Sequence, residues 1–144
     1  MKENVLPITA RAVVNFRLLP GDSIKYALER IRKTINDPEV KVKVLPNSSE
    51  PSPVSDVNSA SYKMLQKTIL SEFPEVVVTP YLVLGATDSR YYTEVSEQVF
   101  KFLPTRMKRE DLKREHGTNE RVGVKNYGEI VKFFTLLIRN SDKM

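Results

Sequence analysis

The sequence has no cysteine, and this absence excludes disulfides, thiolate metal sites and cysteine nucleophiles. No apolar run approaches the length of a membrane span, and the first residues lack the apolar stretch of a secretory signal. Histidine occurs once, as His116. With 144 residues, 40% hydrophobic and 28% charged, the chain has the composition of an ordinary globular protein of one domain or parts of two. The cellular compartment stays open.

The net charge is +5, and much of the excess lies in one short basic segment. Such a segment can bind an anionic partner such as nucleic acid. Three acidic residues interrupt this one, however, and it contains no aromatic residue for base stacking. We therefore favour a solvated face, and expect neither a nucleic acid nor a membrane as partner. The basic residues are Arg106, Lys108, Arg109, Lys113 and Arg114.

The first third of the chain predicts a strand, a helix and a second strand. Residues 8–18 alternate between apolar and polar, which is typical of a half-buried strand. A turn at residues 20–22 is followed by an apolar stripe at helical spacing, which predicts a helix. Asp22 or Ser23 can cap this helix, and residues 36–38 end it. Residues 40–44 alternate again. We expect a βαβ-like unit, with a right-handed crossover if its strands run parallel in one sheet. The stripe consists of Ile24, Ala27, Leu28, Ile31 and Ile35.

A linker rich in proline and serine follows, at residues 46–58. It is either a domain boundary or a long surface loop. A helix is predicted for residues 59–73, capped by Asn58 or Ser59, with an apolar face of Tyr62, Leu65, Ile69 and Phe73.

Two further elements are predicted beyond that helix. The continuous apolar run 76–84 indicates a strand buried on both faces, with Pro80 at an edge or a bulge. A helix is expected over residues 127–139. Its apolar face would consist of Ile130, Val131, Phe134, Leu137 and Ile138.

Two polar clusters are the candidate functional residues. Residues 85–90 follow the run 76–84, and open α/β sheets bind ligands at the carboxyl ends of their strands. There Arg90 offers a planar set of donors suited to a carboxylate. In the second cluster, residues 116–120, His116 could bind a metal or transfer a proton. A surface arginine and a surface histidine are the alternatives. We expect both side chains to converge on one pocket at the mouth of a buried sheet.

Four motifs stand in a fixed order: Asn-Val-Leu-Pro at 4–7, Asn-Phe-Arg-Leu-Leu-Pro-Gly at 15–21, Gly-Ala-Thr-Asp-Ser-Arg at 85–90 and His-Gly-Thr-Asn-Glu at 116–120. Together they resemble the carboxyl-terminal part of the co-catalytic zinc peptidases of family M-twenty. The similarity is strongest to the branch with carboxypeptidase S and secreted N-acyl amino acid hydrolases. Ala86, where that family usually has glycine, is a small departure.

The resemblance implies an α/β fold in three parts. Residues 1–45 would be the second half of a lid, or dimerisation, domain, with 46–58 as the linker. Residues 59–144 would be the carboxyl-terminal strand-and-helix part of the catalytic domain.

The resemblance also implies roles for individual residues. His116 would be a zinc ligand, and Asn119 and Glu120 would orient the ligands. The implied reaction is hydrolysis of an amide bond next to a free carboxylate, in a peptide or an N-acyl amino acid, with two zinc ions. Substrate contacts would come from Asn4, Arg17, Gly85, Thr87 and Arg90.

The sequence departs from the family in its metal ligands. The family supplies a His-x-Asp motif and a Glu-Glu pair, whereas this chain has one histidine and no Glu-Glu pair. One histidine does not hold two zinc ions. We therefore expect part of a longer hydrolase, inactive alone and not holding zinc tightly. The alternative is a non-catalytic module that forms a homodimer through the strand edge at residues 10–18.

Overall fold

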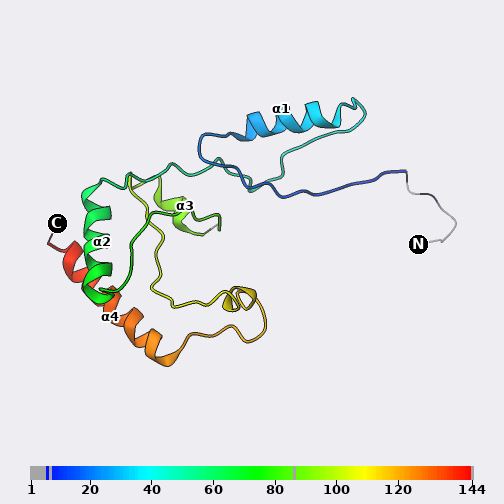
Figure 1. Ribbon diagram of the computed structural model, residues 1–144. Helices are drawn as coiled ribbons and strands as arrows, with labels where there is room; N and C mark the ends of the chain where they lie inside the picture. Colours follow the sequence, from blue (N-terminus) through cyan, green and yellow to red (C-terminus); the bar gives the residue numbers. More distant parts are fainter. Residues whose placement is uncertain (1–5, 7, 86, 144) are drawn as a thin grey trace. The chain divides into compact units, whose positions relative to one another are not determined.

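The computed structural model describes residues 6, 8–85 and 87–143, which divide into two compact units after Ser52. The first unit contains helix α1 (Ile24–Ile35). The second contains α2 (Ala60–Glu72), the short α3 (Ser89–Tyr92), the 3-10 helix η1 (Asp111–Lys113) and α4 (Val124–Ser141), as Figure 1 shows. No helix of the described residues has both the length and the apolar character needed to cross a membrane.

The predicted α/β fold is wrong, because the described part of the chain forms no strand. Residues 8–18, 40–44 and 76–84 all run without strand structure, so the βαβ-like unit, its crossover and the strand of the catalytic part are absent as well. Alternating or continuous apolarity favours an extended backbone, but a strand also needs a ladder of hydrogen bonds to a neighbour. None of these segments forms such a ladder, and Phe16 is 56% exposed.

The first helix begins and ends as its sequence predicts. The backbone N–H of Asp22 donates to the carbonyl of Leu19 at 3.0 Å, across a turn in which Gly21 has a φ of +94°. Of the two candidate caps, Ser23 is the one used, since its hydroxyl accepts from the Tyr26 N–H at 3.1 Å. Asn36 ends the helix in the left-handed conformation.

The core of the second unit lies between α2 and α4. Ile69, Phe73 and Phe133 are its buried hydrophobic residues, and the ring of Phe133 also lies 5.1 Å from that of Phe102. Farther along the two helices, Asn140 Nδ2 donates to the buried Thr68 Oγ1 at 2.9 Å. The predicted helix at 59–73 and its apolar face are confirmed, with Ser59 as the cap. The partly buried residues packed against this core are Leu65, Val76, Val78 and Leu137.

The carboxyl-terminal helix is confirmed, but its predicted face is partly wrong. Phe133 is fully buried, whereas Val131 and Ile138, both assigned to the apolar face, are 52% and 68% exposed. Phe133 and Phe134 are neighbours in the sequence, so the apolar stripe of the helix is broad. The stripe alone therefore does not show which of its residues face α2. In the structure, Phe133 and Leu137 are the residues of α4 that belong to the core with α2.

Candidate functional site

The first polar cluster forms a tight turn, which we call the Arg90 turn (residues 85–93 without Ala86). The hydroxyls of Thr87 and Ser89 lie 2.6 Å apart, and the Ser89 N–H donates to Thr87 Oγ1 at 3.2 Å. The Tyr91 N–H then donates to the carbonyl of Asp88 at 3.0 Å, which begins α3. Hydrogen bonds from small side chains thus hold the backbone next to Arg90 in a turn, and the helix that follows is short.

The guanidinium of Arg90 is exposed and lies against its neighbour Tyr91. Its carbon lies 4.7 Å from the centre of the Tyr91 ring, and Nη2 donates to the Tyr91 hydroxyl at 2.7 Å. The partner is a neutral phenol, so the positive charge is not neutralised by this contact. Arginine has five N–H donors, and its planar shape fits a carboxylate with two parallel hydrogen bonds. The turn can therefore receive a carboxylate.

A second cation is tied to the same turn. The Lys101 ammonium donates to the carbonyl of Gly85 at 3.2 Å. Lys101 lies outside both polar clusters predicted from the sequence. Its contact adds a positive charge beside the Gly85 backbone.

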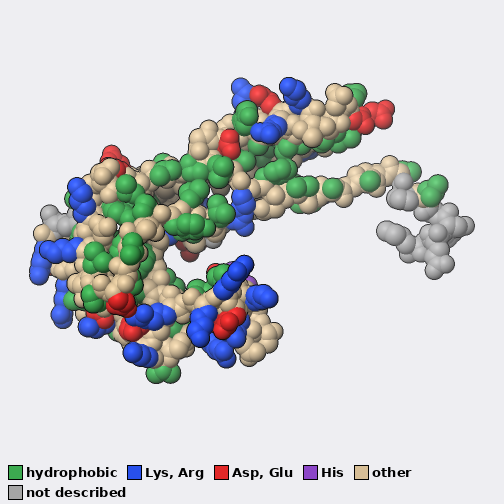
Figure 2. All heavy atoms as spheres, in the orientation of Figure 1, with side chains coloured by type: hydrophobic (Ala, Val, Ile, Leu, Met, Phe, Trp, Pro, Cys, Tyr) green, Lys and Arg blue, Asp and Glu red, His purple; other side chains and the backbone are tan. Residues whose placement is uncertain are grey.

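The second polar cluster lies in a loop at residues 107–122, which we call the His116 loop. The carboxylate of Asp111 accepts from the Lys108 N–H at 2.9 Å and pairs with Arg114. That backbone hydrogen bond is the main reason why the pKa of Asp111 is lowered, with the charges of Arg114 and Arg121 adding to it. Figure 2 shows lysine and arginine side chains gathered over this part of the unit.

His116 itself is exposed and has an unusual backbone. Its φ is +57° and that of Asn119 is +63°, so both lie in the left-handed region. Between them the Gly117 N–H donates to the carbonyl of Arg114 at 2.8 Å. A Cβ at Gly117 would lie 3.2 Å from the Lys113 carbonyl oxygen, which explains the glycine. The local turn therefore sets the direction in which the imidazole leaves the backbone.

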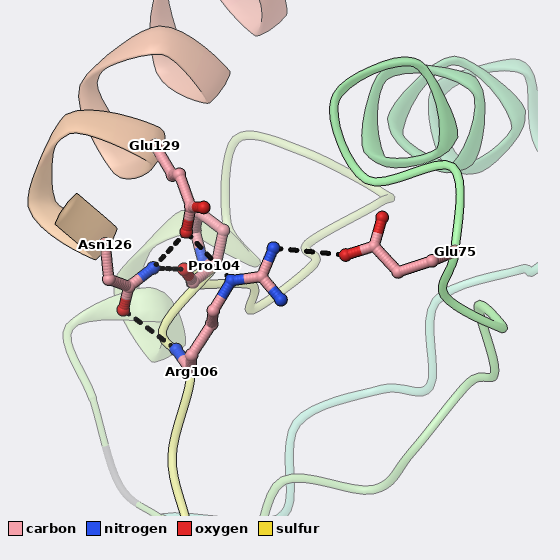
Figure 3. Close-up of polar contacts among 5 residues, drawn as sticks. All are labelled: Glu75, Pro104, Arg106, Asn126 and Glu129. Atoms are coloured by element: carbon pink, nitrogen blue, oxygen red, sulfur yellow. Dashed lines mark hydrogen bonds and ion pairs between the residues drawn. The ribbon is translucent and has the colours of Figure 1, made fainter.

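A group of five residues, which we call the Asn126 clasp, holds the base of the His116 loop (Figure 3). The clasp consists of Glu75, Pro104, Arg106, Asn126 and Glu129. From α4, the Asn126 carboxamide accepts from the Arg106 N–H at 2.9 Å and donates to the Pro104 carbonyl at 2.9 Å. Arg106 Nε donates to Glu129 at 2.9 Å, and its Nη2 donates to Glu75 at 3.1 Å.

Charge pairing in the clasp shifts three pKa values. The hydrogen bond from Arg106 is the main cause of the lowered pKa of Glu129. Hydrogen bonding to its own backbone and then to Arg106 lowers the pKa of Glu75. The pKa of Arg106 is raised, mainly by its hydrogen bond to Glu129. Each of these shifts favours the charged form of its group.

The predicted site residues fall into separate places. Asn4 lies outside the described residues, and Arg17 is an exposed residue of the first unit. Within the second unit, the structure brings Gly85, Thr87 and Arg90 into one turn. It brings His116, Asn119 and Glu120 into one loop. The expected meeting of Arg90 and His116 in one pocket remains a prediction, although the buried sheet expected beside it is absent from the described residues.

The described residues do not fit the two-zinc site that the resemblance implies. Among them, no three or more histidine, aspartate or glutamate side chains gather as a group that could hold a metal ion. His116 would supply a single ligand, whereas zinc in proteins takes at least three protein ligands. We therefore derive no catalytic step through zinc.

The clasp is a part of the structure that the sequence does not predict. The basic segment predicts a solvated face for Arg106, and no motif gives Asn126 a role. One available signal was the spacing of Asn126 and Glu129, which places both on the same side of a helix. The partner segment, 20 residues earlier, could not be inferred from that spacing.

Comparison with known proteins gives relatives over nearly the whole chain. A probable carboxypeptidase S-like 2 of Dictyostelium discoideum is 44% identical over 142 residues, which are 99% of this chain and 27% of that protein. The N-fatty-acyl-amino acid synthase/hydrolase PM20D1 of Homo sapiens is 40% identical over 145 residues, 99% of this chain and 29% of the relative. Carboxypeptidase S of Saccharomyces cerevisiae is 26% identical over 163 residues, 92% of the chain and 28% of the relative.

These relatives confirm the resemblance: the chain is similar in sequence to carboxypeptidase S-like and PM20D1 proteins, which are of the M-twenty type. The chain spans less than a third of the length of these curated relatives. No family model matches the chain, and no solved structure matches it significantly.

Proposed function

We propose that this chain is part of a hydrolase that cleaves an amide bond next to a free carboxylate. The enzyme would be a carboxypeptidase, a dipeptidase or an N-acyl amino acid hydrolase, and the chain would be inactive by itself. The observation behind the proposal is the 44% identity to a carboxypeptidase S-like protein over 99% of the chain. That match includes both the Arg90 turn and the His116 loop.

In this proposal the Arg90 turn binds the carboxylate of the substrate. The exposed guanidinium retains its positive charge, and its stacking on Tyr91 restricts its orientation before the substrate arrives. Gly85 and Thr87 shape the backbone beside it. Asn4 and Arg17 would be further substrate-binding residues of the intact enzyme.

The His116 loop would present one ligand to a metal ion, for which we propose zinc. Asn119 and Glu120 would orient that ligand. The remaining ligands and the general base would come from residues other than those that the structure describes.

A second candidate function is homodimerisation through the first unit. The segment 8–19 is rich in apolar side chains that are more than half exposed: Ile8, Val13, Val14, Phe16 and Leu19. Exposed apolar surface of this kind favours association. Sedimentation of the purified chain tests this candidate: a monomer at all concentrations would count against it.

A chimera of PM20D1 from Homo sapiens tests the hydrolase proposal. The aligned 145-residue segment of that protein is replaced by this chain, and hydrolysis of an N-fatty-acyl amino acid is measured. We expect activity. Arg90→Ala should then raise KM by about 10- to 150-fold, because a charge-assisted hydrogen bond contributes about 1.5–3 kcal/mol.

Arg109→Ala, at an exposed arginine outside both proposed roles, is the control and should leave KM unchanged. A folded chimera without activity would contradict the proposal. An Arg90→Ala chimera with normal KM would contradict the role of the Arg90 turn.

A further inference from the structure

In the described part of the unit, the hydrogen bonds and ion pairs that hold the His116 loop lie at its base. Among the described residues, the hydrogen bonds and ion pairs of residues 107–122 stay within the loop. They include the Asp111–Arg114 pair and the bond from Gly117 to Arg114. Position and orientation of the imidazole therefore depend on how the two ends of the loop are fixed.

The carboxamide of Asn126 joins those two ends. It belongs to the first turn of α4, which follows the loop, and it bonds to both Arg106 N–H and Pro104 carbonyl, which precede it. Asn126 is buried, with 8% of its surface exposed. A carboxamide supplies both the acceptor for Arg106 and the donor for Pro104, whereas a carboxylate supplies only the acceptor.

Arg106 fastens the same base to both helices of the core. Its guanidinium donates to Glu129 on α4 and to Glu75, three residues after the end of α2. It also lies 5.3 Å from the centre of the ring of Phe73, a core residue. The base of the loop is thus tied to the most buried part of the unit (Figure 3).

We infer that Asn126 is a positioning residue for His116, because its carboxamide closes the base of the loop that presents the imidazole. The role rests on the proposed function of the His116 loop. Without the carboxamide, the closed loop loses the two hydrogen bonds to Arg106 and Pro104 that help to offset the entropy cost of closing it. The imidazole would then sample many positions and occupy the productive one less often.

Hydrogen exchange of the full chain tests the clasp itself. Asn126→Ala should raise exchange of the hydrogen-bonded amides of the loop by about tenfold relative to the unsubstituted chain, while the amides of α2 keep their protection. Those loop amides belong to Lys108, Asp111, Arg114 and Gly117. Asn140→Ala is the matched control: the same substitution in the same helix, at the residue that bonds Thr68. It should leave exchange in the loop unchanged.

A second variant keeps the test decisive if Asn126→Ala does not fold. Asn126→Asp retains the acceptor for Arg106 but loses the donor to Pro104 and to Glu129, so it should raise loop exchange in the same direction. Two results would overturn the proposed role of the clasp. In one, the folded variants exchange their loop amides as slowly as the unsubstituted chain; in the other, exchange rises equally in the loop and in α2.

Turnover by the PM20D1 chimera tests the positioning role. Asn126→Ala should lower kcat by about tenfold with KM changed by less than about twofold, as expected when an outer residue orients a ligand. Asn140→Ala should leave kcat and KM unchanged. Faster loop exchange with an unchanged kcat would overturn the positioning role. An inactive unsubstituted chimera would count against the proposed function, and the exchange data would then decide on the clasp alone.

Discussion

At the scale of single residues, the clearest pairing is that of Arg106 with two carboxylates. Glu129 is the more enclosed partner, with 18% of its side chain exposed, and Glu75 is the more exposed one at 57%. Both carboxylates have a pKa below the ordinary value of 4.5. A carboxyl group whose pKa is lower in the folded state stabilises the fold above its unfolded pKa.

The lowered pKa values predict the pH dependence of stability. The contribution of Glu129 and Glu75 should be complete above the ordinary carboxyl pKa and decline as the pH falls through their folded values. The urea midpoint, measured from about pH 7 down to about pH 3, should therefore fall steeply on the acid side. Glu129→Gln should reduce that slope, and Glu94→Gln, at an exposed position, should not. Equal slopes in all three proteins would contradict the pairing.

Local turns were predictable as short motifs, but contacts between distant residues were not. The motif at 85–90 predicts a turn, and the structure has one there because its hydrogen bonds join near neighbours in sequence. The bonds of Asn126 to Arg106 and Pro104 span 20 and 22 residues, and nothing in the spacing of these residues indicates them. Long-range partners are set by packing, which a single sequence does not display.

At the scale of elements, α2 and α4 make the only helix-to-helix packing within the described part of the chain. Phe133 is the centre of that packing, with ring contacts to Phe73, Phe102 and Phe134. Its burial is complete, so truncation would leave a cavity that its neighbours cannot fill.

This packing predicts a contrast between two substitutions in α4. Phe133→Ala should lower the free energy of unfolding by about 3–5 kcal/mol, as expected for a buried aromatic side chain. Ile138→Ala, at a residue that the sequence pattern placed on the apolar face, should change it by less than about 0.5 kcal/mol because its side chain is 68% exposed. Urea unfolding followed by circular dichroism measures both. Similar losses in the two variants would show that the helix packs on the face predicted from the sequence.

Helices were predicted better than strands for a physical reason. The caps Ser23 and Ser59 and the stripe from Leu65 to Phe73 are local features, and a helix satisfies its backbone hydrogen bonds within itself. A strand at residues 8–18 or 76–84 needs a partner at a chosen register. The alternation of side chains cannot supply that partner.

At the scale of the whole molecule, the two units differ in what holds them together. All the buried residues of the described chain lie in the second unit, between Thr68 and Phe133. In the first unit, the apolar stripe of α1 is only partly covered, and none of its residues is buried. Burial of apolar surface is the main favourable contribution to folding, so stability should reside in the second unit.

The distribution of buried residues predicts how the units behave apart. A protein of residues 53–144 should unfold cooperatively on heating, with the helical signal of α2 and α4, whereas residues 1–52 should give no cooperative transition. Circular dichroism melting of the two fragments and of the full chain measures this. A sharp transition in residues 1–52 would reveal a core that the exposed side chains of that unit do not indicate.

The central proposal is that His116 would supply a metal ligand to the active site of the intact hydrolase. Its most direct test is turnover of an N-fatty-acyl amino acid by the PM20D1 chimera with and without His116→Ala. We expect kcat to fall by more than about a hundredfold, because losing a direct ligand should cost more than the 10–100-fold typical of an outer residue. Lys113→Ala, in the same loop, should retain full turnover. Full turnover by the His116→Ala chimera would contradict the account.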